Sequence, residues 1–179
     1  MKLTGEIKFI IGIVVTCIVI VGISINFLST PAQTVDRSNI LTSDTAIKGS
    51  RDAKVYLVEF SDFQCPACGA AKPVVDQIVE KYKDKVVFGY RHFPLPQHQF
   101  GFTAAEAAEA AGEQGKFWQM YEYLFANQAQ LTSEFILTSG KSVGLDEQKF
   151  QDALNNGNFK DKISKDLADG KRLGVNSTP

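Results

Sequence analysis

Cysteine, histidine and tryptophan are scarce in this sequence, and charge of neither sign is in excess. Its 179 residues include three cysteines, two histidines and one tryptophan, and the formal net charge is −1. Three cysteines are too few for a scaffold held together by several disulfides, which excludes that class of small secreted protein. A near-neutral chain without a basic cluster lacks the charge that attracts a polyanion, so we expect no nucleic-acid partner.

One long apolar run lies near the N-terminus. Residues 9–28 carry no charged side chain, and a helix of that length, at about 1.5 Å per residue, spans about 30 Å, the thickness of a bilayer core. Lys2 and Lys8 precede the run, and basic residues favour the cytoplasmic side. We therefore expect a single-pass transmembrane anchor at the cell membrane, with residues 1–8 cytoplasmic and the rest extracytoplasmic, in the bacterial periplasm or at the cell surface. A cleaved signal peptide is the alternative, although no Ala-x-Ala site follows the run.

The chain after this run divides into a linker and one domain. Residues 29–50 are rich in serine, threonine, aspartate, asparagine and alanine, a composition that predicts a flexible linker. Within it, Ile40–Leu41 is a candidate for a short edge strand. The remaining residues, 51–179, are enough for one domain.

A Cys-x-x-Cys motif lies between a predicted strand and a predicted helix. The apolar, β-branched run Val55–Phe60 predicts a buried strand. Proline at position 66 suits the first position of a helix because it lacks an N–H. After Cys65-Pro66-Ala67-Cys68, apolar residues recur at a spacing of three to four and predict a helix: Val74, Val75, Ile78, Val79 and Tyr82. Both thiols are therefore expected in the first helical turn.

This position favours thiol chemistry. The N–H groups of a first helical turn have no partners within the helix and carry partial positive charge, which stabilises a thiolate at Cys65. The helix dipole alone contributes at most about 2 kcal/mol, which is about one pKa unit. We expect Cys65 to be the exposed attacking thiolate. Cys68 would be the inner, resolving thiol, which can reach Cys65 and release a mixed disulfide.

The alternation of strand and helix continues beyond the motif. Val86–Tyr90 predicts a second strand, and a βαβ unit implies that the two strands are parallel. From about residue 100 to 173 the spacing of apolar residues predicts a series of amphipathic helices. The pattern as a whole indicates an α/β domain.

These motifs resemble the DsbA-like branch of the thioredoxin superfamily. The resemblance extends from roughly Ile47 to the C-terminus, and its motifs follow in the same order: Val58–Cys68, Tyr90–Pro96, Ala107–Ala111, Lys116–Trp118 and Gly174–Pro179. It implies a thioredoxin-like fold with an α-helical insertion over about 100–173, and a redox disulfide between Cys65 and Cys68. It also implies cysteine-containing protein substrates and a redox partner that recycles the cysteine pair. No cofactor is expected, because the pair itself carries the electrons.

The resemblance also assigns a role to the end of the sequence. Thr178 and Pro179 match the pair that introduces a cis-proline loop facing the cysteines, with Pro179 as the cis-proline and Thr178 in the substrate-side loop. The strands and the helix that follow this pair in the family are missing here. We therefore expect an incomplete domain, in which the cysteine-bearing strand lacks a neighbour on one side.

Glu59 lies inside the apolar strand, six residues before Cys65. An acidic side chain is costly to bury without a partner, and buried acids with shifted pKa values cluster at active sites. The family has a buried glutamate at the matching place, which makes Glu59 a candidate proton acceptor for Cys68. Alternatively, Glu59 points to solvent at an irregular strand end.

Three functions fit these observations. The leading one is a membrane-tethered, extracytoplasmic thiol–disulfide oxidoreductase. The second is a redox-inactive, membrane-anchored binding module derived from the same fold. The third is a metal-binding Cys-x-x-Cys protein, in which His92 and His98 would complete a zinc site. Zinc sites usually contain two closely spaced ligand pairs, and these histidines are a poor second pair, so no metal is expected.

Overall fold

The computed structural model describes residues 5–28 and 36–179, which belong to two compact units, Met1–Val35 and Asp36–Pro179. The first unit contains one helix, α1 (Gly5–Leu28). The side chains of α1 are described except those of residues 6–8, 10 and 25–28. Among the described residues, no helix is long and apolar enough to cross a membrane. The membrane anchor expected over residues 9–28 lies partly outside these side chains and stays a prediction.

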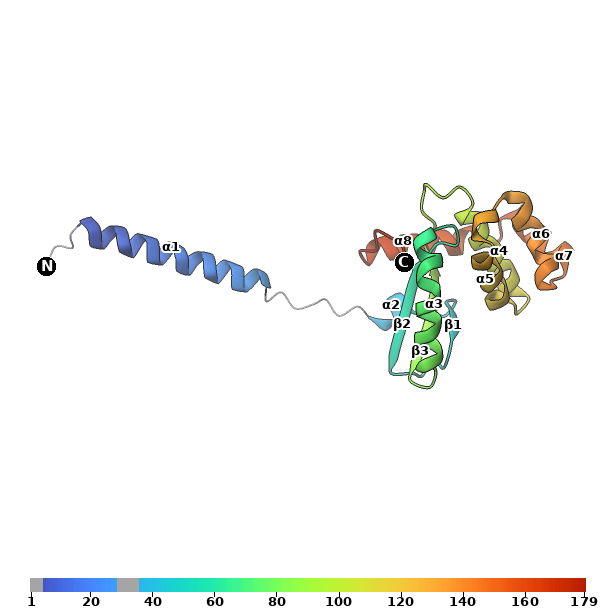
Figure 1. Cartoon of the computed structure of the whole chain (residues 1–179), viewed down its shortest axis with the longest axis horizontal. Coiled ribbons are helices and arrows are strands. Elements are labelled where there is room, and N and C mark those ends of the chain that lie inside the picture. Colours follow the sequence, from blue (N-terminus) through green and yellow to red (C-terminus); the bar gives the residue numbers. More distant parts are fainter. Residues whose placement is uncertain (1–4, 29–35) are drawn as a thin grey trace. The chain divides into compact units, whose positions relative to one another are not determined.

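A three-stranded sheet forms the centre of the second unit (Figure 1). Strands β2 (Val55–Ser61) and β3 (Val86–His92) are parallel and paired from their first residues to their last. Helix α3 (Pro66–Lys81) connects them, which confirms the predicted βαβ unit. Strand β1 (Ala46–Lys48) pairs antiparallel with the other edge of β3, so the strand order is β1-β3-β2.

The compact domain begins earlier than the sequence analysis predicts. Residues 29–35, the first part of the expected linker, lie outside the residues that the structure describes. The second part is structured: the unit begins at Asp36, helix α2 (Arg37–Ile40) follows at once, and β1 joins the sheet. The prediction of a flexible linker over residues 29–50 is therefore wrong from Asp36 onward.

Ile40–Leu41, expected as an edge strand, instead marks the end of α2. Leu41 is buried and contributes to the core. The segment that follows is held by the guanidinium group of Arg51, which donates hydrogen bonds to three main-chain carbonyls, those of Thr42, Ser43 and Thr45. A polar composition suggests a solvated linker, but here the polar main-chain groups are satisfied within the protein.

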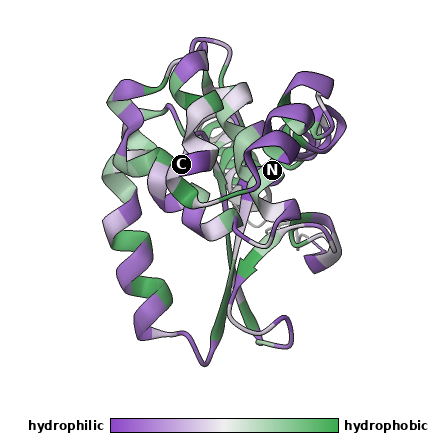
Figure 2. Cartoon of the chain, turned by 90° about the vertical axis from the view of Figure 1, so that its right-hand side faces the viewer, coloured by the Kyte–Doolittle hydropathy of each residue, from purple (hydrophilic) through white to green (hydrophobic). Residues whose placement is uncertain are grey.

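The α-helical insertion predicted over about 100–173 is present. It contains five helices and the short 3-10 helix η1 (Gln128–Gln130). The five are α4 (Gly101–Glu113), α5 (Phe117–Ala126), α6 (Ser133–Val143), α7 (Glu147–Asn156) and α8 (Lys160–Arg172). Helices α4 to α7 pack on one another, and α8 packs on β3 and α4 (Figure 1). In Figure 2 the hydrophobic residues follow the strands, and hydrophilic residues lie on the outer faces of the helices.

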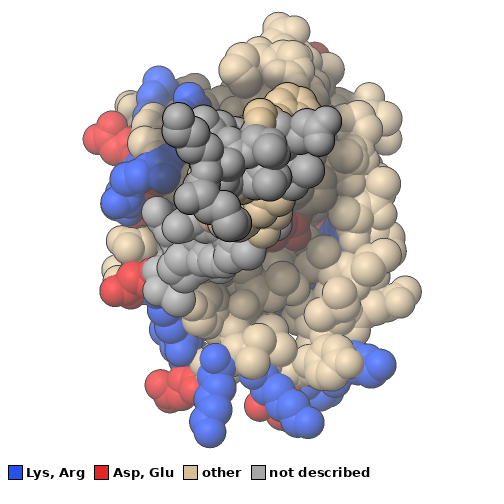
Figure 3. Space-filling model, turned by 90° about the vertical axis from the view of Figure 1, so that its left-hand side faces the viewer, with Lys and Arg blue, Asp and Glu red and all other residues tan. Residues whose placement is uncertain are grey.

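Acidic and basic side chains are mixed on the surface. Along the rim of the face seen in Figure 3, Lys and Arg side chains lie beside Asp and Glu. Exposed side chains also form ion pairs, such as Lys83 with Glu80 at 2.8 Å. This arrangement agrees with the net charge of −1.

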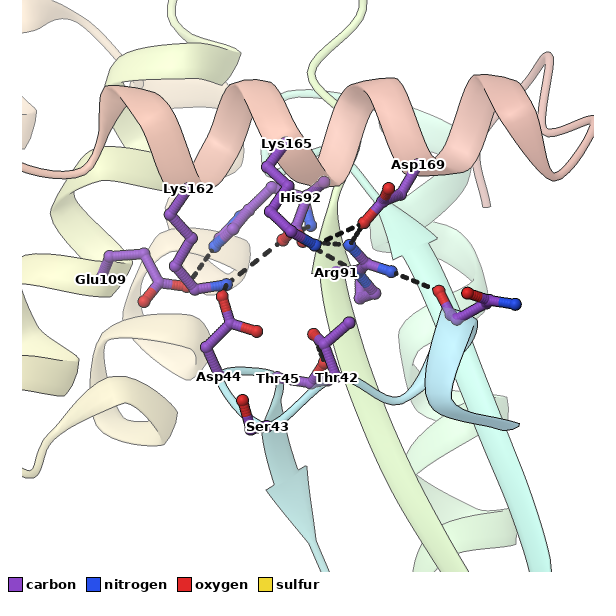
Figure 4. Close-up of polar contacts among 12 residues, drawn as sticks. Thr42, Ser43, Asp44, Thr45, Arg91, His92, Glu109, Lys162, Lys165 and Asp169 are labelled. Atoms are coloured by element: carbon purple, nitrogen blue, oxygen red, sulfur yellow. Dashed lines mark hydrogen bonds and ion pairs between the residues drawn. The ribbon is translucent and has the colours of Figure 1, made fainter. Parts of the chain in front are cut away.

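A buried ion network fastens α8 to the sheet (Figure 4). The side chain of Arg91, on β3, is completely buried and donates hydrogen bonds to Asp166 at 2.6 Å and to Asp169 at 2.7 Å. It also donates to the main-chain carbonyl of Asn39, in α2, at 3.0 Å. Lys162, one turn earlier on α8, contacts Asp166 at 3.3 Å. A single arginine thereby joins the sheet, the first segment of the domain and the last helix.

We predict that Arg91→Met lowers the free energy of unfolding by about 3 kcal/mol, because it leaves the carboxylate of Asp166 buried without its arginine partner and removes one of the three cations that pair with Asp169. Urea unfolding of the full chain, followed by circular dichroism, measures the change. Lys149→Met is the matched control, since Lys149 forms an exposed pair with Asp146 at 3.5 Å and such pairs are worth less than about 1 kcal/mol. If the free energy of unfolding fell equally in the two variants, the buried network would stabilise the fold no more than an exposed ion pair does.

Candidate active site

The two cysteines lie where strand β2 passes into helix α3. Cys65 is the N-cap residue of α3, with extended backbone angles (φ −74°, ψ 118°), and Pro66 is the first helical residue. This confirms the predicted placement of the motif in the first helical turn. Both cysteines are free thiols, so the structure describes the reduced form.

Cys65 is less exposed than the sequence analysis predicts. Its side chain is mostly covered, with 6% of the residue accessible, whereas Cys68 is completely buried. Cys65 is covered because the end of the chain folds over it: its Sγ donates a hydrogen bond to the carbonyl oxygen of Thr178 at 3.8 Å. The expected order still holds, since Cys65 is the outer thiol and Cys68 the inner one.

The two thiols have opposite tendencies to ionise. Burial is the largest influence on Cys65 and opposes ionisation. The side chain of Thr178, the Cys68 thiol and the N–H groups of Cys68 and Ala67 together outweigh it and lower the pKa of Cys65 below its ordinary value. Burial raises the pKa of Cys68, against smaller opposing effects of the Ser61 hydroxyl and a main-chain N–H. These shifts give one thiol suited to attack and one held protonated.

Thr178 and Pro179 lie beside the cysteines, as the resemblance implies. The peptide bond between them is cis. Thr178 is buried, and its carbonyl is the acceptor for the Cys65 thiol. Pro179 lines a mainly apolar cavity of about 340 Å³, together with residues of β2 and α3. The roles expected for the two residues stay predictions.

Glu59 also lines this cavity, and it is buried rather than directed to solvent. Burial, with a further contribution from Asp76, raises the pKa of Glu59, and Ser61 and Lys72 oppose the shift. Its Oε2 atom has no hydrogen-bond partner among the described residues. Burial therefore favours the protonated form of this carboxyl group more than water would. The structure thus confirms the buried glutamate, and its role in proton transfer stays a prediction.

The loop before Cys65 is held by residues that the sequence analysis did not single out as functional. Gln128, on η1, donates hydrogen bonds through Nε2 to the main-chain carbonyls of Phe63 at 2.7 Å and Cys65 at 2.9 Å. Gln64 accepts one through Oε1 from the N–H of Phe100 at 2.6 Å. These contacts join residues more than thirty positions apart, and no local pattern indicates them.

The two histidines have carboxylate partners. His98 Nδ1 lies 2.7 Å from Asp62 Oδ2, and His92 Nε2 lies 2.8 Å from Glu109 Oε1. In the described ranges 5–28 and 36–179, no group of three or more His, Cys, Asp and Glu side chains is arranged to hold a metal ion. The structure therefore does not assemble the zinc site weighed in the sequence analysis.

Strand β2, which leads to the cysteines, is paired on one edge only. Its partner is β3, and within residues 36–179 no strand pairs with its other edge. This agrees with the expectation that the cysteine-bearing strand lacks a neighbour on one side. The cavity lined by Glu59 and Pro179 lies along the free edge.

The sequence of this chain matches a family model and several curated proteins. A family model described as thioredoxin matches residues 41–179. A curated relative, the Na(+)/H(+) antiporter NhaA 3 of Salinispora tropica, is 37% identical over 134 residues, which is 74% of this chain and 20% of the antiporter. The chain thus spans about a fifth of the length of the curated relatives it matches.

Solved structures share the fold. A thioredoxin-like oxidoreductase from Silicibacter pomeroyi DSS-3 superposes with a TM-score of 0.70 at 27% identity, covering 81% of this chain and 83% of its own. The thiol-disulfide exchange protein α-DsbA2 from Wolbachia pipientis gives the same TM-score at 24% identity, covering 79% of this chain and 77% of its own.

We predict that iodoacetamide modifies reduced Cys65 faster than Cys68 at pH 7, because the thiolate is the nucleophile and only Cys65 has a lowered pKa. The rates are measured between pH 5 and 9 by mass spectrometry. The full chain carries Cys17→Ser, so that the third cysteine does not react. A Cys65→Ser variant isolates the rate of Cys68. Faster labelling of Cys68 would reverse the two roles.

Proposed function

Because this chain belongs to the thioredoxin family and has the DsbA-like form of its fold, we propose that it is a thiol–disulfide oxidoreductase that acts through Cys65 and Cys68. One observation carries the proposal. The outer thiol has a lowered pKa and the inner thiol a raised pKa, within one helical turn. A pair of this kind can form a mixed disulfide and then resolve it.

The exchange transfers two electrons. With the pair oxidised, a substrate thiolate attacks Sγ of Cys65, the Cys65–Cys68 bond breaks, and the electron pair leaves on Cys68 as a thiolate. A second substrate thiolate then attacks the substrate sulfur of the mixed disulfide and releases Cys65 as a thiolate. The substrate has gained a disulfide, and the pair is reduced. The reverse sequence reduces a substrate disulfide, with Cys65 as the attacking group.

Glu59 supplies a proton acceptor for the inner thiol. Cys68 is buried and protonated in the reduced form, so it must lose a proton before it can attack a mixed disulfide. Glu59 lies in the same strand as Ser61, which adjoins the inner thiol, and it borders the cavity that lies along the free edge of β2. Its raised pKa suits a group that accepts a proton and passes it on.

The substrates in this proposal are proteins with cysteine residues. The structurally similar α-DsbA2 is described as a thiol-disulfide exchange protein. In this chain, Cys65 lies beside Thr178, and the adjoining cavity is mainly apolar and bordered by residues of β2 and α3. A redox partner returns the pair to its starting state after each cycle.

The proposal includes a membrane tether and an extracytoplasmic domain. Residues 9–28 carry no charge, and Lys2 and Lys8 precede them, a pattern typical of a single-pass segment with its N-terminus in the cytoplasm. Residues 5–28 form one helix. A Cys-x-x-Cys pair on the outer side would work in a compartment in which disulfides persist.

We predict that Cys68→Ser in the full chain captures substrate proteins as mixed disulfides on Cys65, because the resolving thiol is absent. Diagonal electrophoresis with and without reductant, followed by mass spectrometry, detects them. Cys65→Ser/Cys68→Ser is the control and should capture none. A glutathione titration of the parent chain should show one reversible two-electron midpoint. No captured protein and no midpoint would indicate the redox-inactive binding module instead.

We further predict that the full chain sediments with membranes and resists extraction at alkaline pH, whereas a chain that lacks residues 1–28 is released. A membrane-impermeant maleimide should label Cys65 in intact cells that express the Cys17→Ser form, with Cys65→Ser as the control. Release of the full chain, or labelling only after the cells are broken, would contradict the tether or the orientation.

A further inference from the structure

The exchange chemistry makes no use of one buried charged group beside the cysteines. The carboxylate of Asp62, the residue that follows β2, is completely buried. It accepts hydrogen bonds from the N–H of Gln64 at 2.8 Å and the N–H of Leu95 at 2.8 Å. It also pairs with His98 Nδ1 at 2.7 Å. These partners belong to the loop before Cys65 and to the loop after β3.

The main chain of Asp62 contacts both cysteines. Its carbonyl accepts a hydrogen bond from the N–H of Cys65 at 3.0 Å. Its own N–H is one of the groups that favour ionisation of Cys68, although burial outweighs it. A small movement of Asp62 would therefore shift the cap of α3 and the surroundings of both sulfur atoms.

The carboxylate has little freedom to move. A buried carboxylate is costly unless its oxygens are hydrogen-bonded, so the three donors fix where it lies. Helix α4 closes the remaining side: a Cβ atom on Gly101 would lie 2.6 Å from Asp62 Oδ1. His98 remains partly accessible, with 17% of its side chain exposed. The pair thus joins a fixed, buried carboxylate to a partly exposed imidazole, so His98 can be substituted without disturbing the core.

We propose that Asp62 and His98 form a positioning pair for thiol exchange, which anchors the loop before Cys65 to the loop after β3 and so holds the main chain of Asp62 against both cysteines. The pair touches neither substrate nor the reacting sulfur atoms through its side chains. This inference rests on the proposed function, in that the reaction it serves is exchange at Cys65.

The consequence follows from the geometry of the cap. The N–H groups of Ala67 and Cys68 stabilise the Cys65 thiolate only while Cys65 keeps its position at the start of α3. Loss of the pair loosens the loop that sets this position, so the thiolate should be less stable and the pH profile of Cys65 modification should move to higher pH.

The test compares His98→Ala with His98→Asn in the full chain carrying Cys17→Ser. The amide of asparagine can replace Nδ1–H as a donor to Asp62, and alanine cannot. We expect His98→Ala to raise the pH midpoint of Cys65 modification by about one unit, which slows modification by about tenfold at pH values below that midpoint, and to shift the glutathione midpoint. We expect His98→Asn to restore both measurements to within about twofold of the parent, since the bond to the carboxylate is kept.

Two further variants extend the test to the carboxylate. Asp62→Ala removes both oxygens that accept the three hydrogen bonds. Asp62→Asn keeps one acceptor for Gln64 but can place its NH₂ group against the N–H of Leu95, so it should behave like Asp62→Ala. Asp146→Ala is the matched control: Asp146 caps α7 by accepting a bond from Lys149 N at 3.1 Å, far from the cysteines in sequence. It should lower the melting temperature without changing modification of Cys65.

The outcomes separate a positioning role from a structural one. If His98→Ala lowers only the melting temperature, as Asp146→Ala should, and the modification profile of Cys65 stays at that of the parent, the inference is overturned. If Asp62→Ala does not fold, the two variants of His98 decide alone. If the parent chain shows no glutathione midpoint, the proposed function fails, while the modification profiles still decide whether the pair positions Cys65.

Discussion

The site depends on the insertion of one aromatic ring into the helical part of the domain. Phe63, two residues before Cys65, is 1% exposed. Its ring centroid lies 5.2 Å from that of Tyr90 on β3 and 5.0 Å from that of Phe125 on α5. Burial of such a side chain contributes about 1.5–3 kcal/mol, and each aromatic contact adds about 0.5–1.5 kcal/mol. The loop that carries the cysteines is therefore held by the sheet and the helical insertion together, which explains why Gln128 on the insertion also reaches its carbonyls.

This arrangement divides the site into a polar outer side and an apolar inner side. On the outer side, Cys65 meets Thr178 and the N–H groups at the start of α3, which favour a charged sulfur. On the inner side, burial raises the pKa of both Cys68 and Glu59, so each group ionises less readily there than in water. The pKa values of two thiols separated by two residues differ here because Cys65 lies at the start of α3, whereas Cys68 lies against the aromatic core. The same difference gives the pair its order of reaction.

Contiguous residues decide the parts of the structure that can be predicted from the sequence, and contacts between distant residues decide the parts that cannot. The strand β2, the cap at Cys65 and the parallel strand β3 follow from apolar spacing and turn residues within a short stretch. The segment from Asp36 to residue 50 was misread because its order comes from distant contacts, such as the bond from Trp118 Nε1 to the carbonyl of Ile47 at 3.0 Å. Asp62 is not among the candidate site residues of the sequence analysis, since nothing local shows that Leu95 and His98 lie against it.

The ion network around Arg91 bears on the site through the path of the chain. Asp166 and Asp169 fix α8 on β3, and α8 lies so close that a Cβ atom on Gly170 would meet the ring of Phe93 at 2.7 Å. The helix ends in an ordered turn, in which the N–H of Val175 donates to the carbonyl of Gly170 at 2.9 Å. A few residues later the chain brings Thr178 to Cys65. A displacement of α8 would move this last segment with it, so the buried charges that hold the helix also determine whether the carbonyl of Thr178 lies over the outer thiol.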